Sequence, residues 1–224
     1  MASRNSVKEY ISDSFYHIYN RGVEQRKIFL DEQDYSVFLS YLKTYLSPID
    51  KADLENILSS PDSTSKEKDK ALKLLKLRNY SKDLDLVCYS LMPNHFHLLV
   101  HQKDIVINSF ANSIGTRYAM YFNRKYKRKG VLFQDVYKAV LVKSEEQLLH
   151  LSRYIHLNPI KASNPTLPSS LSEYLGLRKT DWIKAHHIMD YFSVSKPKFT
   201  YQDFIGSVAD GEFISPVAID LDGE

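Results

Sequence analysis

Two strand-like runs of residues lie almost back to back near the middle of the chain. Residues 84–91 (LDLVCYSL) and 95–101 (HFHLLVH) are mostly aliphatic or aromatic, and only Met92, Pro93 and Asn94 separate them. A short link that contains proline and asparagine is typical of a tight turn. The two runs therefore predict an antiparallel hairpin, and with it a fold that contains an antiparallel sheet.

The remaining patterns place one strand before this hairpin and one after it. Alternating aromatic and aliphatic residues predict strands, and apolar residues at helical spacing predict helices. By these criteria we expect strands over 15–22 (FYHIYNRG) and 136–142 (VYKAVLV), and helices over 31–45 and 105–126. The resulting order, βαββαβ, predicts an α+β fold of the ferredoxin-like type, in which helices cover one face of an antiparallel sheet.

One more helix is expected directly after the last strand. Ser144 is a suitable N-cap, Glu145 and Glu146 follow in the first turn, and the helical pattern continues to Pro159. A chain of 224 residues builds one core of ordinary size, so we predict a single main domain over residues 1–162.

Three segments are expected to lie outside this core. Residues 47–83 are rich in charge and turn formers, with only a short helical pattern at ALKLLKL, and predict a surface insertion. Residues 163–198 contain short helical patterns and predict a small helical C-terminal extension. Residues 199–224 predict an acidic tail, because they contain six acids and no Lys or Arg.

The residues before the acidic tail carry a larger positive charge than the whole chain does. The whole chain has 30 Lys and Arg against 27 Asp and Glu, so the net charge of +3 understates the positive charge of the residues before the tail. This asymmetry favours a polyanionic partner, although a merely soluble surface could have the same composition.

Neither a membrane protein nor a secreted protein is indicated. No apolar run approaches the roughly 18 residues that span a bilayer, and the N-terminal MASRNSVKEY is too polar for a signal peptide. We therefore expect a cytoplasmic protein without a membrane partner. Cys88 is the single cysteine, so an intramolecular disulfide is impossible and a buried core position is expected.

His95 and His97 are two residues apart in a predicted strand, so their side chains project from the same face while Phe96 points to the other. Two adjacent imidazoles can chelate one metal ion, but they can equally be hydrogen-bonded histidines of an ordinary sheet. A metal site would need a third ligand. His101 shares their face but lies roughly 13 Å beyond His97 along a strand, too far for the same ion.

Tyr154 and Asn158 are four residues apart in the last predicted helix and so share one face of it. Asn158 can offer an amide oxygen to a metal. Tyr154 offers a phenol, which becomes a competent nucleophile only beside a cation or a base. With 16 tyrosines in the chain, a packed aromatic is the simpler interpretation, and spacing alone does not distinguish the two.

Residues 117–130 (RYAMYFNRKYKRKG) interleave six basic side chains with four aromatic ones, and no acid occurs between Asp104 and Asp135. Cations for phosphates and aromatic faces for unstacked bases are what single-stranded nucleic acid requires. An ordinary amphipathic helix with core aromatics and a solvated basic end would have the same composition.

Taken together, the motifs resemble one family. YHIYNRG, MPNHFHLLV, RYAMYFNRKYKRKGVLFQ, YKAVLV and SRYIHLNPIKA occur in the order seen in REP-associated tyrosine transposases, which are relatives of the single-strand insertion-sequence transposases in the His-hydrophobic-His superfamily. The resemblance covers about residues 14–192, and MPNHFHLLV followed by RYIHLNP is its most specific part. It also implies a ferredoxin-like catalytic sheet.

By position, the resemblance assigns His95 and His97 to the metal-binding pair, Tyr154 to the nucleophile and Asn158 to the third metal ligand. It implies a divalent ion, Mg²⁺ or Mn²⁺, although zinc could occupy the site. As DNA contacts we expect Arg117, Tyr118, Arg124, Lys125, Lys127, Arg128 and Lys138. The chain departs from the family at Asp135-Val136, where relatives commonly have Gly-Arg, and this affects an expected basic contact and the shape of the turn.

The implied activity is metal-dependent nicking and strand transfer of single-stranded or hairpin-bearing DNA through a 5′-phosphotyrosine, by a monomer or a homodimer. Two alternatives follow from the same motifs. One is a non-catalytic protein that binds DNA hairpins and is derived from such an enzyme. The other is a metal-dependent phosphodiesterase that uses water in place of Tyr154.

Overall fold

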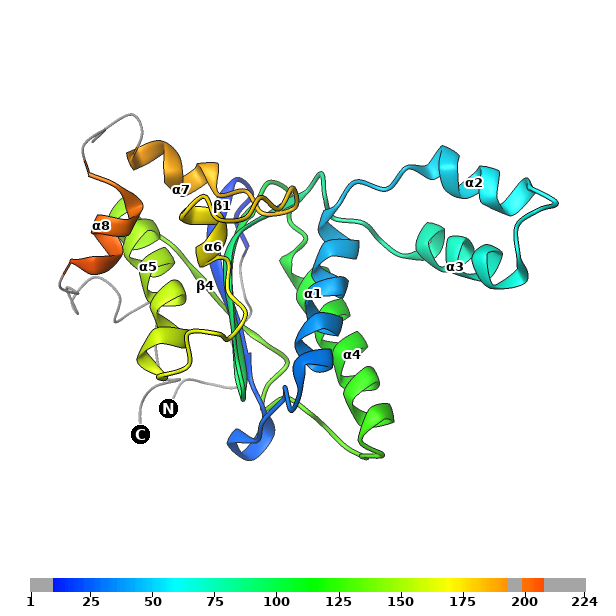
Figure 1. Cartoon of the computed structure of the whole chain (residues 1–224), viewed down its shortest axis with the longest axis horizontal. Helices are drawn as coiled ribbons and strands as arrows, with labels where there is room; N and C mark the ends of the chain where they lie inside the picture. Colours follow the sequence, from blue (N-terminus) through cyan, green and yellow to red (C-terminus); the bar gives the residue numbers. More distant parts are fainter. Residues whose placement is uncertain (1–9, 193–198, 208–224) are drawn as a thin grey trace.

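A four-stranded sheet forms the centre of the computed structural model, which describes residues 10–192 and 199–207 (Figure 1). Its strands are β1 (Ser14–Arg21), β2 (Leu84–Met92), β3 (His95–Gln102) and β4 (Lys138–Leu141), arranged in the order β2-β3-β1-β4. All three strand pairs are antiparallel. This order, with helices between β1 and β2 and between β3 and β4, confirms the ferredoxin-like α+β fold expected from the βαββαβ pattern.

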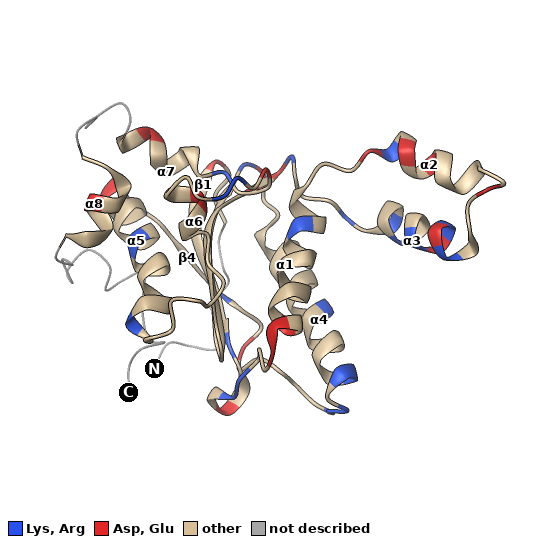
Figure 2. Cartoon of the chain, viewed as in Figure 1, with Lys and Arg blue, Asp and Glu red and all other residues tan. Residues whose placement is uncertain are grey.

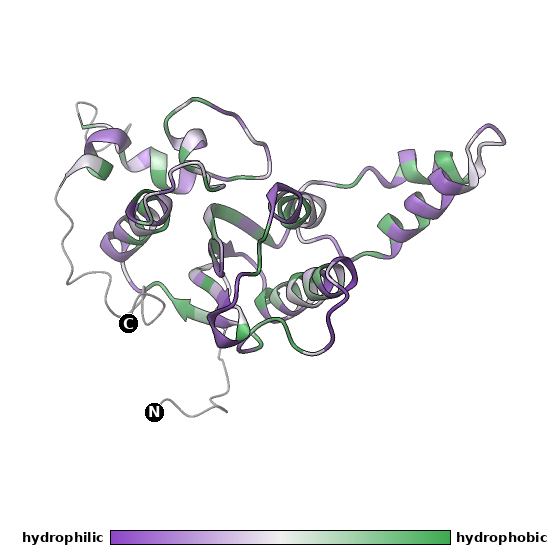
Figure 3. Ribbon diagram, turned by 60° about the horizontal axis from the view of Figure 1, so that its bottom comes forward, coloured by the Kyte–Doolittle hydropathy of each residue, from purple (hydrophilic) through white to green (hydrophobic). Residues whose placement is uncertain are grey.

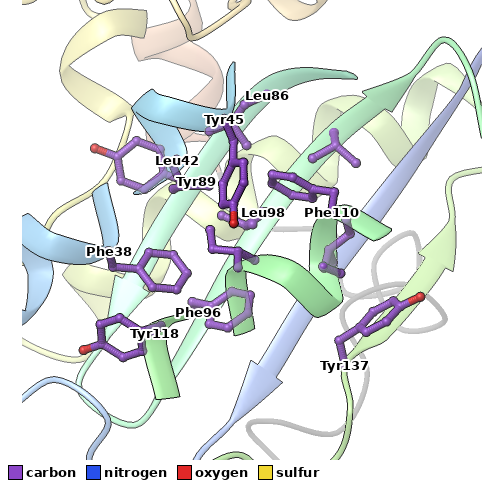
Figure 4. Close-up of a cluster of buried hydrophobic side chains, with 14 of the residues drawn as sticks. Phe38, Leu42, Tyr45, Leu86, Tyr89, Phe96, Leu98, Phe110, Tyr118 and Tyr137 are labelled. Carbon is purple, nitrogen blue, oxygen red and sulfur yellow. The ribbon is translucent and has the colours of Figure 1, made fainter. Parts of the chain in front are cut away.

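One face of the sheet is covered by α1 (Glu32–Leu46) and α4 (Ile107–Lys125). Helix α1 begins at Asp31, whose side chain accepts a hydrogen bond from the Asp34 N–H. The aromatic core under these helices includes Phe38, Phe96, Phe110 and Tyr118, which Figure 4 shows gathered between the helices and the strands. Figure 3 shows green (hydrophobic) stretches within the sheet, interrupted by purple (hydrophilic) ones.

The opposite face carries α5 (Glu145–Lys161), which begins at the Ser144 cap as expected. A second core lies between this helix and the sheet and contains Cys88, Leu99, Leu151 and Ile155. Strand β3 alternates between the two cores, because Leu99 faces α5 whereas Leu98 and Val100 face α1 and α4. The histidines at 95 and 97 have the same parity as Leu99 and therefore lie on the α5 face.

The C-terminal segment forms short helices beside α5, namely α6 (Leu171–Tyr174), α7 (His186–Asp190) and α8 (Tyr201–Gly206). The first two lie in the segment for which a helical extension was predicted. Helix α8 lies at the start of the predicted acidic tail, and residues 208–224 of that tail lie outside the described residues.

The predicted surface insertion, residues 47–83, is more ordered than its composition indicated. It contains α2 (Lys51–Ser59) and α3 (Ser65–Lys76), which form a helical hairpin that projects from the body (Figure 1). Helix α3 has a capping box, in which the Thr64 side chain and the Glu67 side chain each bind the other residue's backbone N–H. The short pattern at ALKLLKL is only the second half of this helix.

Two local details differ from the predicted element boundaries. Strand β4 starts at Lys138 instead of 136, because the carbonyls of Asp135 and Val136 accept hydrogen bonds from the Asn20 side chain at 2.9 Å. A 3₁₀ turn, η1 (Val23–Gln25), follows β1. Within the described ranges no helix combines the length and the apolar character needed to cross a membrane.

Candidate active site

The two histidines of β3 lie side by side on the α5 face of the sheet. Their ring centroids are 4.9 Å apart and the ring planes are nearly perpendicular, at 86°. In the strand register, His97 is opposite Tyr19 of β1 and Ser90 of β2, so it sits in the middle of the sheet. Both side chains are buried, with exposed fractions of 7% for His95 and 0% for His97.

Hydrogen bonds orient both imidazole rings. The Nδ1 atom of His97 lies 2.8 Å from Nε2 of His17 on β1, and Nδ1 of His95 lies 2.7 Å from the side-chain oxygen of Asn94. In metal sites, such partners on one ring nitrogen hold the ring and direct the other nitrogen to the metal. The Nε2 atom of His97 is buried and has no hydrogen-bond partner among the described residues.

The electrostatic surroundings keep His97 neutral. Burial lowers the pKa of His97 well below its ordinary value, and the nearby charges of His95, His17 and Arg21 lower it further. A neutral imidazole is the form that binds a metal. The Nε2 atom of His97 therefore has no competing hydrogen bond among the described residues, and its ring has the protonation state of a metal ligand.

The turn that leads into His95 is held from both sides. The backbone carbonyl of Asn94 accepts from the Gly22 N–H at 2.8 Å, and that of Pro93 accepts from the Ile28 N–H at 2.7 Å. A side chain at Gly22 would strike the backbone carbonyl of Arg26, so glycine is required here by space and not by its backbone angles. The loop after β1 therefore fixes the start of β3.

Helix α5 brings Tyr154 to the histidines. The Tyr154 and His97 ring centroids are 5.5 Å apart at 83°, so the two rings meet edge to face. The Lys161 ammonium lies 5.7 Å from the centre of the Tyr154 ring. A phenol, an imidazole and a cation from two elements far apart in the sequence thus lie together on the α5 face of the sheet.

Asn158 follows Tyr154 by one helical turn, and both side chains are 6% exposed. The side-chain amide of Asn158 contains a buried atom, Nδ2, without a hydrogen-bond partner among the described residues. Unsatisfied buried polar atoms are uncommon in folded proteins, and a missing ion or water is one explanation for them. The Nδ2 atom of Asn158 is a donor, so its missing partner would be an acceptor such as water, whereas a metal ion would bind the side-chain oxygen.

A pocket of about 350 Å³ adjoins the histidines across β1. Arg21 pairs with His95 in the strand register, and Lys138 of β4 lies with its ammonium 5.7 Å from the Tyr19 ring centre. The Nε atom of Arg21 is buried without a hydrogen-bond partner in the described part of the chain. The pocket is lined by Tyr19, Asn20, Arg21, Glu24, Gln25, Gln134, Asp135 and Lys138.

Asp135 also lines this pocket, together with Glu24, so the departure from the family pattern places an acid beside Arg21 and Lys138. Val136 is 70% exposed. Two cations and two acids therefore share the pocket, and the acids offset the attraction of the cations for a phosphate.

Some basic side chains at the end of α4 are exposed, and others form contacts within the protein. Arg124, Lys127 and Lys129 are exposed, and Figure 2 shows blue at the lower end of α4, on the same side of the molecule as the β3 turn. Lys125 instead contacts the carboxylates of Asp31 at 2.7 Å and Asp34 at 2.8 Å. These ion pairs join α4 to the start of α1 and would compete with a phosphate for Lys125.

The expected DNA contact at Tyr118 is wrong. Its side chain is 0% exposed, it packs against Phe29 and Phe38, and its hydroxyl donates to the Ile28 carbonyl at 2.6 Å. A ring without an exposed face cannot stack on a base, so here the core interpretation of the aromatic pattern holds.

Arg117 and Arg128 are partly engaged within the protein. The Arg117 guanidinium lies 4.0 Å from the centre of the Tyr41 ring, a cation–π contact. Arg128 donates to the side chain of Asn123 at 2.8 Å and to the carbonyl of Val131 at 3.1 Å.

His101 lies near the other end of β3, away from Tyr154. Together with Asp85 and His187 it forms a group whose potential ligand atoms lie within 4.8 Å of one another. This group could hold a metal ion, and none of its members was among the metal ligands predicted from the sequence.

Two residues of the site were not singled out from the sequence, namely His17 and Arg21. Both belong to the motif YHIYNRG, and strand alternation places them on the same face as Tyr19. That alternation was the available signal. Which residues of β3 they would meet depends on the β1–β3 register, which the sequence does not give.

Comparison with known proteins supports the resemblance. Residues 63–158 match the family described as "Transposase IS200 like", and this range contains both histidines, Tyr154 and Asn158. No curated protein matches the chain.

Two solved structures are similar to this chain. A REP-associated tyrosine transposase bound to a REP hairpin has 13% sequence identity and a TM-score of 0.46, with 80% of this chain and 91% of that chain covered. A putative transposase from Deinococcus radiodurans R1 has 15% identity and a TM-score of 0.36, with 71% and 98% covered. The resemblance that the motifs predict thus agrees with the family match, in which residues 63–158 are similar to the IS200-like transposases.

Proposed function

We propose that this chain is a metal-dependent enzyme that nicks single-stranded DNA and transfers the strand through a 5′-phosphotyrosine on Tyr154. The family of residues 63–158 supports a transposase activity. The contact between Tyr154 and the histidine pair supports the tyrosine mechanism. The proposed substrate is single-stranded DNA, including strands that carry a hairpin, as the motif resemblance implies.

In the proposed reaction the Tyr154 phenol oxygen attacks the scissile phosphorus in line with the leaving 3′-oxygen. The phenol loses its proton, the new phosphorus–oxygen bond forms, and the departing 3′-oxygen takes up a proton as its bond to phosphorus breaks. The intermediate is a phosphodiester like the substrate, so a different 3′-hydroxyl can attack it and release Tyr154 without ATP. Cleavage and joining are then the same step in opposite directions.

Three side chains favour the negative charge that develops in this step. Lys161 lies over the Tyr154 ring and is placed to stabilise charge near the phenol oxygen. Arg21 and Lys138 border the pocket next to His95 and would contact the phosphates of the strand that enters it. Arg124, Lys127 and Lys129 would add contacts farther along the backbone.

His95, His97 and Asn158 would hold the divalent ion. The histidines fit this role, because Nε2 of His97 is buried with no hydrogen-bond partner among the described residues, and Asn94 and His17 orient the two rings. Asn158 would contribute its side-chain oxygen. When bound, a divalent ion would polarise the scissile phosphate. Imidazole and amide-oxygen ligands with remaining water positions suit Mg²⁺ or Mn²⁺.

The observation that carries the proposal is the edge-to-face contact of Tyr154 with the buried, neutral His97. A covalent-adduct assay tests it, with single-stranded hairpin DNA labelled at its 3′ end so that a 5′-phosphotyrosine product retains the label. The wild type is expected to form a labelled protein band. Tyr154→Phe keeps the ring and its packing, so it should still bind DNA but form no adduct and no rejoined product.

Tyr137→Phe is the matched control. Tyr137 is also buried, and its hydroxyl hydrogen-bonds to Tyr10 and Asn108. This variant should retain adduct formation. An adduct with Tyr154→Phe would mean that another residue is the nucleophile, and cleavage by the wild type without any adduct would favour the water-using phosphodiesterase.

The double change of His95 and His97 to Ala tests the metal site separately. It should abolish metal-dependent nicking while hairpin binding and the far-UV circular dichroism spectrum stay close to those of the wild type. Binding without nicking by the wild type itself, across Mg²⁺ and Mn²⁺ concentrations, would favour the non-catalytic DNA-hairpin protein.

A further inference from the structure

A second group of metal-ligand side chains lies at the far end of the sheet from Tyr154. Asp85 near the start of β2 is paired in register with His101 near the end of β3, and His187 of α7 lies above them. His101 is four residues beyond His97, roughly 13 Å along the strand. The group is therefore separate from the candidate active site.

The spacing of the three side chains is close to that of a metal-ligand set. Nε2 of His187 lies 3.1 Å from Oδ2 of Asp85, and Nδ1 of His101 lies 4.0 Å from the same oxygen. All three potential ligand atoms lie within 4.8 Å of one another. Ligand atoms bound at about 2.0–2.1 Å to a tetrahedral ion are roughly 3.4 Å apart, so small side-chain rotations would complete the set.

The nitrogen of His101 that faces this group is unsatisfied. Its Nδ1 atom is buried and has no hydrogen-bond partner among the described residues. Its Nε2 atom lies 2.9 Å from a carboxylate oxygen of Asp13. The Asp13 carboxylate accepts a hydrogen bond, so Nε2 is the nitrogen of His101 that carries the proton. The lone pair is then on Nδ1, which faces Asp85 and His187.

Asp85 is also placed as a ligand. Its carboxylate is buried, and Lys103 binds the oxygen Oδ1 at 2.7 Å, so Oδ2 is the oxygen that faces the two imidazoles. The bonds to His187 and Lys103 outweigh the effect of burial and lower the pKa of Asp85 to about 2, which keeps the carboxylate ionised at neutral pH. The Lys103 ammonium would compete with a metal ion for this carboxylate, but it binds Oδ1 and leaves Oδ2 to the metal.

We propose that Asp85, His101 and His187 bind a divalent transition-metal ion of the zinc class. Two imidazole nitrogens and one carboxylate oxygen form a three-residue set typical of zinc, with a fourth position left for water. The ion has a structural role, because it joins α7, a helix of only five residues, to two strands of the sheet. It would thus fasten the C-terminal helices that pack beside α5.

Zinc titration of the full chain, stripped with chelator and followed by calorimetry, tests this site. His187→Gln and His101→Gln should each lower the number of bound Zn²⁺ ions by one relative to the wild type and remove part of the Zn²⁺-induced rise in melting temperature. His186→Gln is the matched control, because His186 is the exposed neighbour of His187 in the same turn and the two ring centroids are 4.3 Å apart. It should leave the number of bound ions unchanged.

The His95→Ala, His97→Ala double variant separates this site from the candidate active site, since it should still bind one Zn²⁺. Cobalt supplies a second measurement that does not depend on stability, because tetrahedral Co²⁺ has visible absorption that His187→Gln should abolish on this background. Lys103→Met removes the competing cation and should increase the affinity for Zn²⁺ several-fold. The proposal fails if the double variant binds no Zn²⁺, or if His186→Gln and His187→Gln have equal effects.

Discussion

Nε2 of His17 lies 2.8 Å from Nδ1 of His97, although 80 residues separate the two in the chain. Both side chains are fully buried, and their rings are stacked with centroids 5.0 Å apart. His17 touches no substrate position in the proposed mechanism. Its expected role is to hold the ring of His97 and to leave the other ring nitrogen for the proposed metal ion.

His17→Phe is therefore expected to weaken the metal site without removing a ligand. Loss of an orienting partner typically costs about 10- to 100-fold in metal affinity, so the Mn²⁺ concentration that gives half-maximal nicking should rise by that factor. Saturating Mn²⁺ should restore most of the rate, whereas it should not rescue His97→Ala. His17→Gln keeps a hydrogen-bonding atom and should have a smaller effect. An unchanged metal dependence for His17→Phe would show that the bond to His97 is only structural.

The exposed cations at the end of α4 are expected to control the salt dependence of DNA binding. Changing Arg124, Lys127 and Lys129 together to Gln should reduce the slope of log affinity against log salt by up to about 2, since each lost phosphate contact on a single strand contributes about 0.7. The same three-charge change at Lys66, Lys70 and Lys73 on the projecting α3 is the control. Equal effects of the two triple variants would mean that only total charge matters.

Lys125 should behave differently from these cations, because its partners are Asp31 and Asp34. Burial raises the pKa of Asp34, but hydrogen bonds from Lys125, the Leu30 N–H, Tyr126 and Tyr121 outweigh it, so the pKa lies below its ordinary value. The corresponding stability is present above the unfolded pKa of about 3.9 and is lost as the pH falls through the folded value.

Asp34→Asn is thus expected to lower the melting temperature by several degrees at pH 7 and to have a smaller effect at pH 2. Thermal unfolding across this pH range is the measurement. A melting-temperature difference that is the same at both pH values would contradict the assignment of this stability to the ionised carboxylate.

A second pH dependence of stability is expected from His156, which is a buried base and not, like Asp34, a carboxylic acid. Its ring is fully buried on α5, and its nitrogens hydrogen-bond to the hydroxyls of Tyr201 at 2.7 Å and Ser170 at 2.8 Å. Burial lowers the pKa of His156 to about 3. The unfolded chain takes up this proton near pH 6.5 whereas the folded chain does not, so the free energy of unfolding should decrease as the pH falls from about 6.5 toward 3.

The slope contributed by one such group is at most about 1.4 kcal/mol per pH unit. Urea unfolding at pH 7 and pH 5 measures it, and His156→Gln should make the difference between the two pH values smaller. A variant with the same pH dependence as the wild type would show that His156 is not the group responsible.

The sequence predicts best what depends on local periodicity. The parity of His95, His97 and Leu99 follows from a two-residue repeat, and the helical repeat places Tyr154 and Asn158 on one face. The elements and their order follow from the same periodicities, and the ferredoxin-like sheet follows from that order. The helix over 65–76 was also predictable, since Thr64-Ser65-Lys66-Glu67 has the capping-box pattern that its charged composition obscured.

What could not be predicted depends on contacts between distant segments. Lys125 belongs to a basic run in the sequence, but its carboxylate partners are about ninety residues away on α1. Tyr118 has the same aromatic pattern as a base-stacking residue, and only the packing of α4 on α1 shows that its ring is enclosed. The cluster of Asp85, His101 and His187 likewise requires the strand register and the position of α7.

The edge-to-face contact between Tyr154 and His97 is made within a single copy of the chain. Helix α5 follows β4 through the two residues Val142 and Lys143 and the Ser144 cap and packs on the sheet of its own chain. The consequence is genetic as well as structural. Two inactive copies, one with Tyr154→Phe and the other with His97→Ala, should not complement each other when mixed or co-expressed, because neither copy would contain a complete set of reacting groups.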